Sequence, residues 1–125
     1  MTDIAPPEVQ NDLVIEGAGG LLVPLNSQEF IIDLIKEFAD KTILVANLYL
    51  GSINHTLMSI ESLNQRNIEI AGIIFNGQSN SHSESIILSY GGCKSLLHLE
   101  PNSQINTENV RLWAKELRTN LEKDY

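Results

Sequence analysis

Residues 16–20 combine residue types that could bind a metal–nucleotide pair. Their sequence is Glu-Gly-Ala-Gly-Gly, a carboxylate followed by a glycine-rich turn. Magnesium prefers carboxylate oxygens, and glycines let the backbone approach a phosphate group closely. The same residues also suit a tight turn after a strand, with Glu16 in solvent. A magnesium–phosphate site and a plain turn are therefore both open interpretations.

Two further segments carry groups that could bind an anion or a base. Residues 51–55, Gly-Ser-Ile-Asn-His, are expected where a helix begins, and the free N–H groups and dipole of a helix start favour anions. Ser52 could equally be an ordinary N-cap, with His55 solvated. The amide of Asn76 carries a donor and an acceptor and could read a purine edge. Asn76-Gly77 is also a common turn pair.

Short apolar runs are expected to hold these segments in place. They cover residues 13–15, 42–46 and 70–75, with a weaker run at 95–99. Such runs are typical of strands buried on both faces of a parallel sheet. Ligands bind such sheets at the carboxyl ends of the strands, which is where the three segments fall.

Amphipathic helices alternate with these strands. Ile31, Leu34, Ile35 and Phe38 form one apolar stripe, and Asn26 with Glu29 could cap that helix. Further helices are expected over residues 53–63, 83–90 and 110–121. The helix over 83–90 is expected to end at Gly91-Gly92. The last helix is expected to start at Asn106 or Thr107 and to place Trp113 in the core. The alternation predicts a three-layer α/β fold with a mostly parallel sheet.

Composition limits the functional classes. The 125 residues, 13.9 kDa, suit one domain, expected over residues 12–125 after a polar lead-in at 1–11. A net charge of -8 argues against binding nucleic acid or an anionic membrane through a basic face. Cys93 is the single cysteine, which excludes an internal disulfide and favours a reducing, cytoplasmic location. The lead-in has no signal-peptide pattern.

Three blocks of the chain resemble dethiobiotin synthetase, an enzyme family of biotin biosynthesis. They are residues 13–25, residues 43–45 leading to 50–57, and residues 70–76, in the family's order and near its spacing. The resemblance implies a P-loop NTPase type of fold, a homodimer, and use of ATP, Mg²⁺ and CO2. The family closes 7,8-diaminononanoate into dethiobiotin through a carbamate that ATP phosphorylates and a second amine attacks.

The resemblance also implies roles for particular residues. By position, Glu16 matches the magnesium-binding carboxylate, and the loop on the phosphate side is Gly17, Ala18 and Gly19. The segment that holds the substrate's carboxylate across the dimer interface is Gly51, Ser52, Ile53 and Asn54. Asn76 matches the residue that reads adenine, with Gly77 beside it. The last nucleotide-contacting loop is Pro101, Asn102 and Ser103, where His98 replaces a usual glycine and Glu100 an apolar residue.

One departure from the family is a missing motif. No segment matches the phosphate-binding loop G-x-x-x-x-G-K-[ST], and the family's catalytic lysine has no counterpart. Also missing are its first strand, its substrate-binding serine and its second magnesium-binding aspartate. The sequence therefore predicts an incomplete, C-terminal portion of the enzyme. This portion is expected to be inactive by itself, because it lacks the lysine and backbone amides that bind the γ-phosphate.

Two hypotheses follow for the chain. In the first, a complementary segment supplies the P-loop and the family activity holds for the complete protein. In the second, the chain is a non-catalytic, dimer-forming interaction module derived from that enzyme. Amidoligases of the cobyrinic acid type share the general fold, but residues 51–56 fit dethiobiotin synthetase better.

Overall fold

The computed structural model describes residues 4–101 and 104–123 and divides the chain into two compact units. The N-terminal unit ends at Asp40, and the second, here called the sheet unit, begins at Lys41. Each unit is described by itself.

The sheet unit alternates strands and helices. Its elements are β1 (Thr42–Asn47), α2 (Ser52–Gln65), β2 (Ile70–Asn76), α3 (Ser81–Gly91), β3 (Ser95–Leu99) and α4 (Thr107–Glu122). The three strands lie in the order β1-β2-β3 and all pair in parallel. The predicted α/β fold with a parallel sheet is confirmed.

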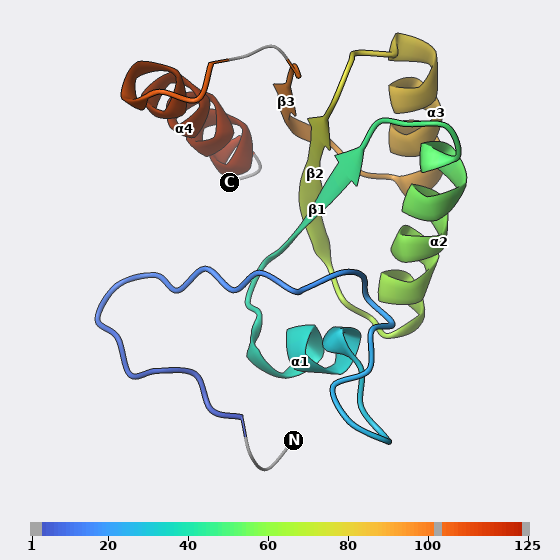
Figure 1. The fold of residues 1–125 in the computed structure, drawn as a ribbon, viewed down its shortest axis with the longest axis vertical. Coiled ribbons are helices and arrows are strands. Elements are labelled where there is room, and N and C mark those ends of the chain that lie inside the picture. The colour runs from blue at the N-terminus through green and yellow to red at the C-terminus, as the bar shows by residue number, and fades with distance from the viewer. Residues whose placement is uncertain (1–3, 102–103, 124–125) are drawn as a thin grey trace. The chain divides into compact units, whose positions relative to one another are not determined.

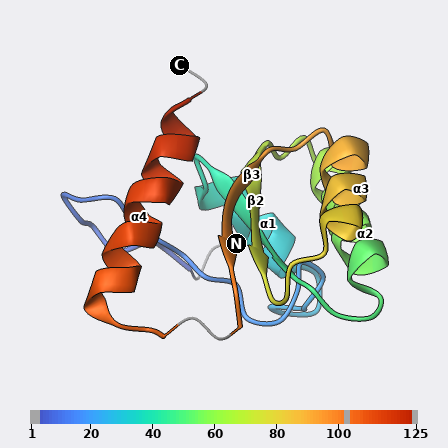
Figure 2. The ribbon, with the colours of Figure 1, turned by 90° about the horizontal axis from the view of Figure 1, so that it is seen from above.

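Helices cover both faces of this sheet. The crossover helices α2 and α3 lie side by side on one face, and α4 lies on the other, beside β3 (Figures 1 and 2). Asn120 of α4 donates a hydrogen bond from Nδ2 to the carbonyl of Leu96 in β3, 2.8 Å away. The unit therefore has the three predicted layers.

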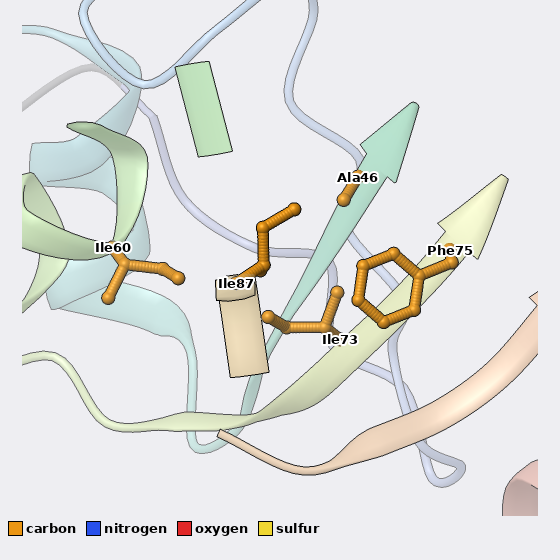
Figure 3. Close-up of a cluster of buried hydrophobic side chains, with 5 residues drawn as sticks. All are labelled: Ala46, Ile60, Ile73, Phe75 and Ile87. Carbon is orange, nitrogen blue, oxygen red and sulfur yellow. The ribbon is translucent and has the colours of Figure 1, made fainter. Parts of the chain in front are cut away.

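The core lies between the sheet and the crossover helices. Figure 3 shows its central cluster, which draws on β1, β2, α2 and α3 and consists of Ala46, Ile60, Ile73, Phe75 and Ile87. The helical side chains are Ile60 and Ile87, which point at the strand residues. Burial of these apolar groups is what holds the crossovers on the sheet.

The prediction that every strand is buried on both faces is wrong for β1. Ala46 is its one buried residue, while Val45 on the opposite face is 56% exposed. The physical reason is coverage, because on the opposite face α4 packs against β3 rather than β1.

Most helix ends agree with the sequence. Gly92 ends α3 in the left-handed conformation, with φ 60°. Asn106 starts α4, and its Oδ1 accepts a hydrogen bond from the Asn109 amide at 2.9 Å. Among the described residues, no helix is long and apolar enough to span a bilayer.

Helix α4 differs from the prediction in its packing. Trp113 is half-buried rather than in the core, and the described part of α4 has no fully buried residue. The amphipathic stripe predicted the helix itself, but the depth of burial depends on how much surface packs against it.

The N-terminal unit contains α1 (Ile31–Phe38), as predicted. Residues 13–15 form no strand, and Val14 is 92% exposed. A strand requires a neighbour for its backbone hydrogen bonds, and no described residue pairs with this run. Asn26 and Glu29 do bond to one another, at 2.6 Å, but the helix starts after Phe30, whose amide donates to Asp33 Oδ2.

Replacing Phe75 with alanine is expected to destabilise the sheet unit strongly. Its ring is 0% exposed and fills the centre of the core. The cavity should lower the free energy of unfolding by about 3–5 kcal/mol, measured by urea denaturation. Ile105→Ala is the control, because Ile105 is 88% exposed and its loss should change stability little. Equal losses for the two variants would contradict this core.

Candidate functional site

The Asn76–Gly77 junction connects the carboxyl ends of all three strands. The Leu48 amide, just after β1, donates to the Asn76 carbonyl at 2.8 Å. The Gly77 amide donates to the carbonyl of Leu99 in β3 at 3.0 Å. This junction therefore lies at the edge of the sheet where parallel α/β folds bind ligands.

Side chains from the neighbouring strands add two hydrogen bonds to the junction. Asn76 donates from Nδ2 to Asn47 Oδ1 at 2.7 Å. His98 Nε2 lies 2.9 Å from the Gly77 carbonyl, which can only accept, so this nitrogen donates. The imidazole also stacks on Phe75, with ring centroids 6.3 Å apart. The strand ends thus form an ordered polar surface, and the apolar side chain of Phe75 packs beneath it.

Glu84 of α3 extends this network. Its Oε1 accepts hydrogen bonds from the Asn80 amide at 2.8 Å and the Ser79 hydroxyl at 3.0 Å. Its Oε2 lies 3.4 Å from His98 Nδ1, and Glu100 Oε1 lies 3.6 Å from His98 Nε2. His98 therefore fixes the turn after β2 against the start of α3. Spacing along the chain gave no sign of this role, which arises only from the register of β2 and β3.

Gly77 is required for the close approach of the chain at this junction. It adopts φ 130°, and a Cβ there would lie 3.1 Å from both the Cβ and the carbonyl oxygen of Leu48. The backbone conformation of Gly77 thus agrees with the interpretation of Asn76-Gly77 as a turn. The Asn76 side chain remains exposed and can still contact a ligand.

Residues 51–54 form the start of α2, as the sequence predicts. The N-cap is Gly51, with φ 97° and no side-chain cap, so the prediction of Ser52 as N-cap is wrong. Ser52 is instead buried inside the first turn, and its amide donates to the Tyr49 carbonyl at 2.9 Å. Glycine occupies the N-cap position because the backbone there is in the left-handed region, which glycine adopts without a steric cost. Since no side chain caps the helix, the amides of Ile53 and Asn54 suit an anion.

Tyr49 is a residue that sequence reasoning missed. Its hydroxyl lies 2.6 Å from His55 Nδ1, across the start of α2. The side chain of Asn54 reaches along the helix to Met58 Sδ at 3.5 Å. Tyr49, His55 and Asn54 are all exposed. The six-residue separation of Tyr49 and His55 spans the strand-to-helix turn and follows no helical or strand period.

Glu16 and its loop belong to the N-terminal unit. Glu16 is exposed. A Cβ at Gly17 would lie 2.8 Å from Ile31 Cγ2, and one at Gly19, with φ 85°, would lie 2.9 Å from Val23 Cγ2. Glycine is therefore needed at both positions for packing within the unit. That Glu16 shares an edge with Ser52 and Asn76 stays a prediction.

The remaining predicted site residues that the structure describes lie outside the strand-end junction. Pro101 is an exposed turn residue after β3, and Asn102 and Ser103 lie outside the described residues. Cys93 is half-buried, and burial raises the pKa of its thiol, which disfavours the reactive thiolate. Within residues 4–101 and 104–123, no three His, Cys, Asp or Glu side chains gather as a metal site. A shallow hollow along α4 contains none of the predicted residues.

Comparison with known proteins assigns the family. Residues 1–109 match the family described as an AAA domain. The chain belongs to this family.

Individual relatives carry more specific names. The chain is 54% identical over 110 residues to an ATP-dependent dethiobiotin synthetase of Cytophaga hutchinsonii, covering 88% of this chain and 53% of that protein. It is 46% identical over 119 residues to the Christiangramia forsetii protein of the same name, covering 95% and 57%. A bifunctional biotin biosynthesis protein of Bordetella avium is 36% identical over 118 residues, covering 94% and 25%. The predicted resemblance is confirmed, and the chain spans about half the length of the dethiobiotin synthetases.

Replacing Gly77 with alanine is expected to disrupt the strand-end junction. The new Cβ would collide with Leu48 backbone and side chain in a conformation that alanine rarely adopts. We expect a loss of about 1–3 kcal/mol in the free energy of unfolding, with the amide chemical shifts of Leu48 and Leu99 displaced. Gly20→Ala is the matched control, since nothing lies within 4 Å of its added Cβ. Unchanged shifts at Leu48 would show that the junction is not packed this way.

Proposed function

We propose that the chain forms part of a dethiobiotin synthetase, which carboxylates 7,8-diaminononanoate and closes it to dethiobiotin with ATP and Mg²⁺. The observation that carries this proposal is 54% identity, over 88% of the chain, to a protein of that name. In the proposed reaction, an amine of the substrate takes up CO2 as a carbamate and ATP phosphorylates the carbamate. The second amine then displaces phosphate and closes the cyclic urea. The cytoplasm is the proposed location.

Adenine is the proposed ligand of the strand-end junction. Asn76 is exposed at the carboxyl end of the central strand, and its amide can pair with the edge of a base. The Gly77 turn is held by hydrogen bonds from both sides, so it offers a preorganised backbone. Pro101, Asn102 and Ser103, in the chain that follows β3, complete the proposed nucleotide contacts.

Glu16 is the proposed magnesium ligand in this chain. Mg²⁺ usually takes one or two protein carboxylates and fills its other positions with phosphate and water, so a single exposed carboxylate fits it. The ion would neutralise charge on the phosphates of ATP. The loop of Gly17, Ala18 and Gly19 would bring backbone amides close to those phosphates. Its tight packing on Ile31 and Val23 supports a fixed loop shape.

The start of α2 is proposed to hold the carboxylate of the substrate, with a second copy of the chain beside it. The uncapped amides of Ile53 and Asn54 supply donors at the positive end of the helix. Leu50, just before Gly51, is fully exposed, and Tyr49 and Met58 are more than half exposed. Tyrosine and methionine are enriched at interfaces between proteins, and exposed apolar groups mark interaction surfaces.

A complementary segment is proposed to supply the phosphate-binding loop. The chain has no segment that matches G-x-x-x-x-G-K-[ST], and its dethiobiotin synthetase relatives are about twice the length that it spans. The lysine and amides of such a loop stabilise the charge that develops at the γ-phosphate. Charge stabilisation by the chain's own residues is therefore expected to be insufficient for turnover.

The activity test combines the chain with that missing part. We expect no dethiobiotin from the chain alone, and measurable product after addition of the portion of the Cytophaga hutchinsonii enzyme that the chain does not cover. Glu16→Gln should lower turnover of the mixture at least ~100-fold, because one metal ligand is lost. Mass spectrometry of product formed from diaminononanoate, bicarbonate and Mg²⁺-ATP measures this.

Glu8→Gln is the matched control, since it removes another exposed carboxylate of the same unit. Its turnover should equal that of the unchanged mixture. Product from the chain alone would refute the need for a P-loop segment. A mixture that binds no Mg²⁺-ATP by calorimetry would refute the proposed function and favour a non-catalytic interaction module.

Replacing Leu50 with aspartate is expected to weaken the proposed dimer. A charge at this exposed apolar position would be desolvated in the interface, which should raise the dimer Kd at least ~10-fold. Sedimentation velocity over a concentration series measures the dimer. Ile105→Asp serves as control because Ile105 is also apolar and, at 88%, highly exposed, but it precedes α4 rather than α2. A wild-type chain that stays monomeric would exclude this interface.

A further inference from the structure

We propose that the pairing of β3 with β2 protects Asn76 from deamidation, and that Asn76 is the asparagine modified fastest when this pairing opens. The chain contains one Asn-Gly sequence, at residues 76–77. The modification needs no reactant other than water, and the inference does not rest on the proposed function.

The chemistry of an Asn-Gly sequence makes Asn76 labile. The backbone nitrogen of Gly77 attacks Asn76 Cγ and forms a C–N bond, while the bond from Cγ to Nδ2 breaks. The leaving amide group takes up the proton of the Gly77 amide and departs as ammonia. Water then opens the resulting succinimide ring and leaves an aspartyl or isoaspartyl residue at position 76. Glycine favours this attack because it has no side chain beside the nitrogen and its backbone turns easily.

Packing at the strand ends requires the glycine that makes Asn76 labile. Gly77 has φ 130°, and a Cβ there would lie 3.1 Å from both the Cβ and the carbonyl oxygen of Leu48. Another residue at position 77 would therefore strain the junction. Asn76 is exposed, so water reaches its side chain. A labile Asn-Gly sequence is thus a consequence of how this junction packs.

Two hydrogen bonds hold the peptide group between Asn76 and Gly77 from opposite sides. Its carbonyl accepts from the Leu48 amide at 2.8 Å, and its N–H donates to the Leu99 carbonyl at 3.0 Å. Ring closure requires this peptide group to rotate toward Asn76 Cγ, which breaks both bonds. It also requires the nitrogen to lose the proton that it donates to Leu99. The paired strands therefore keep the nucleophile away from Cγ.

His98 resists the opening of this arrangement. Its Nε2 donates to the Gly77 carbonyl at 2.9 Å, and its Nδ1 lies 3.4 Å from Glu84 Oε2. Because His98 precedes Leu99 in β3, these contacts connect the strand that accepts from the Gly77 amide to the turn that follows it. Deamidation should thus be limited by a local opening of β3, the same event that exposes the Gly77 amide to hydrogen exchange.

The first experiment follows Asn76 in the full chain by peptide mapping with mass spectrometry at one mildly alkaline pH. In guanidinium chloride, where the sheet is unfolded, we expect Asn76 to be converted faster than any other asparagine of the chain. In buffer its conversion should be at least ~10-fold slower, since it must await the local opening. Gly77→Ala should slow the conversion in the denatured chain, which identifies the reaction as attack by the Gly77 nitrogen.

His98→Ala tests whether the protection comes from the strand ends. The variant should raise the deamidation rate of Asn76 and the hydrogen-exchange rate of the Gly77 amide, each at least ~3-fold, because one hydrogen bond no longer resists the opening. His82→Ala, which removes an exposed histidine of α3, is the matched control and should leave both rates unchanged. If His98→Ala does not fold, the wild type in guanidinium chloride below its unfolding transition replaces it, and both rates should rise together.

The outcomes decide the proposal without reference to a nucleotide. Conversion of Asn76 in buffer at the rate of the denatured chain would overturn it. A Gly77 amide that exchanges freely while Asn76 stays intact would overturn it as well, because the protection would then have another source. Since no measurement involves ATP, either result leaves the proposed function untouched.

Discussion

Backbone pairing of β2 with strands on both sides is the constraint on which the rest of the sheet unit depends. Because all three strands run in parallel, their carboxyl ends meet at one edge, and the loops that follow them come together there. Asn47, Asn76 and His98 lie far apart in sequence but become neighbours through this register alone. The same pairing buries Phe75 and Ile73 beneath the edge, so the polar surface lies on a packed apolar base.

The polar edge owes its order to hydrogen bonds that converge on two residues. Asn76 and Gly77 together bond to the chain after β1, to β3 and to the side chains of Asn47 and His98. Ligand sites need groups held in place before the ligand arrives, because ordering them on binding costs free energy. A turn fixed from both sides meets that need, which is why the proposed base contact is assigned here rather than to the exposed hollow along α4.

The apolar surface that remains exposed is consistent with the proposed partners. One face of β1 leaves Val45 more than half exposed, and Leu50 and Tyr49 follow at the start of α2. Parallel sheets are usually covered on both faces, and contiguous exposed apolar groups mark interaction surfaces. A complementary P-loop segment and a second copy of the chain would each cover such surface.

The sequence by itself determined the element types and most of the helix limits. Periodicity predicted α1 but not its N-cap, and Asn106 and Gly92 marked a helix start and a helix end because caps act within one turn of the chain. It also placed Asn76, Gly77 and residues 51–54 at strand ends and helix starts. The tertiary structure alone decided that residues 13–15 form no strand, that β1 and Trp113 are only partly buried, and that Asn47, Tyr49 and His98 join the candidate sites. Those outcomes depend on which segments become neighbours, and strand register and packing across the sheet are long-range interactions that no local pattern of residues encodes.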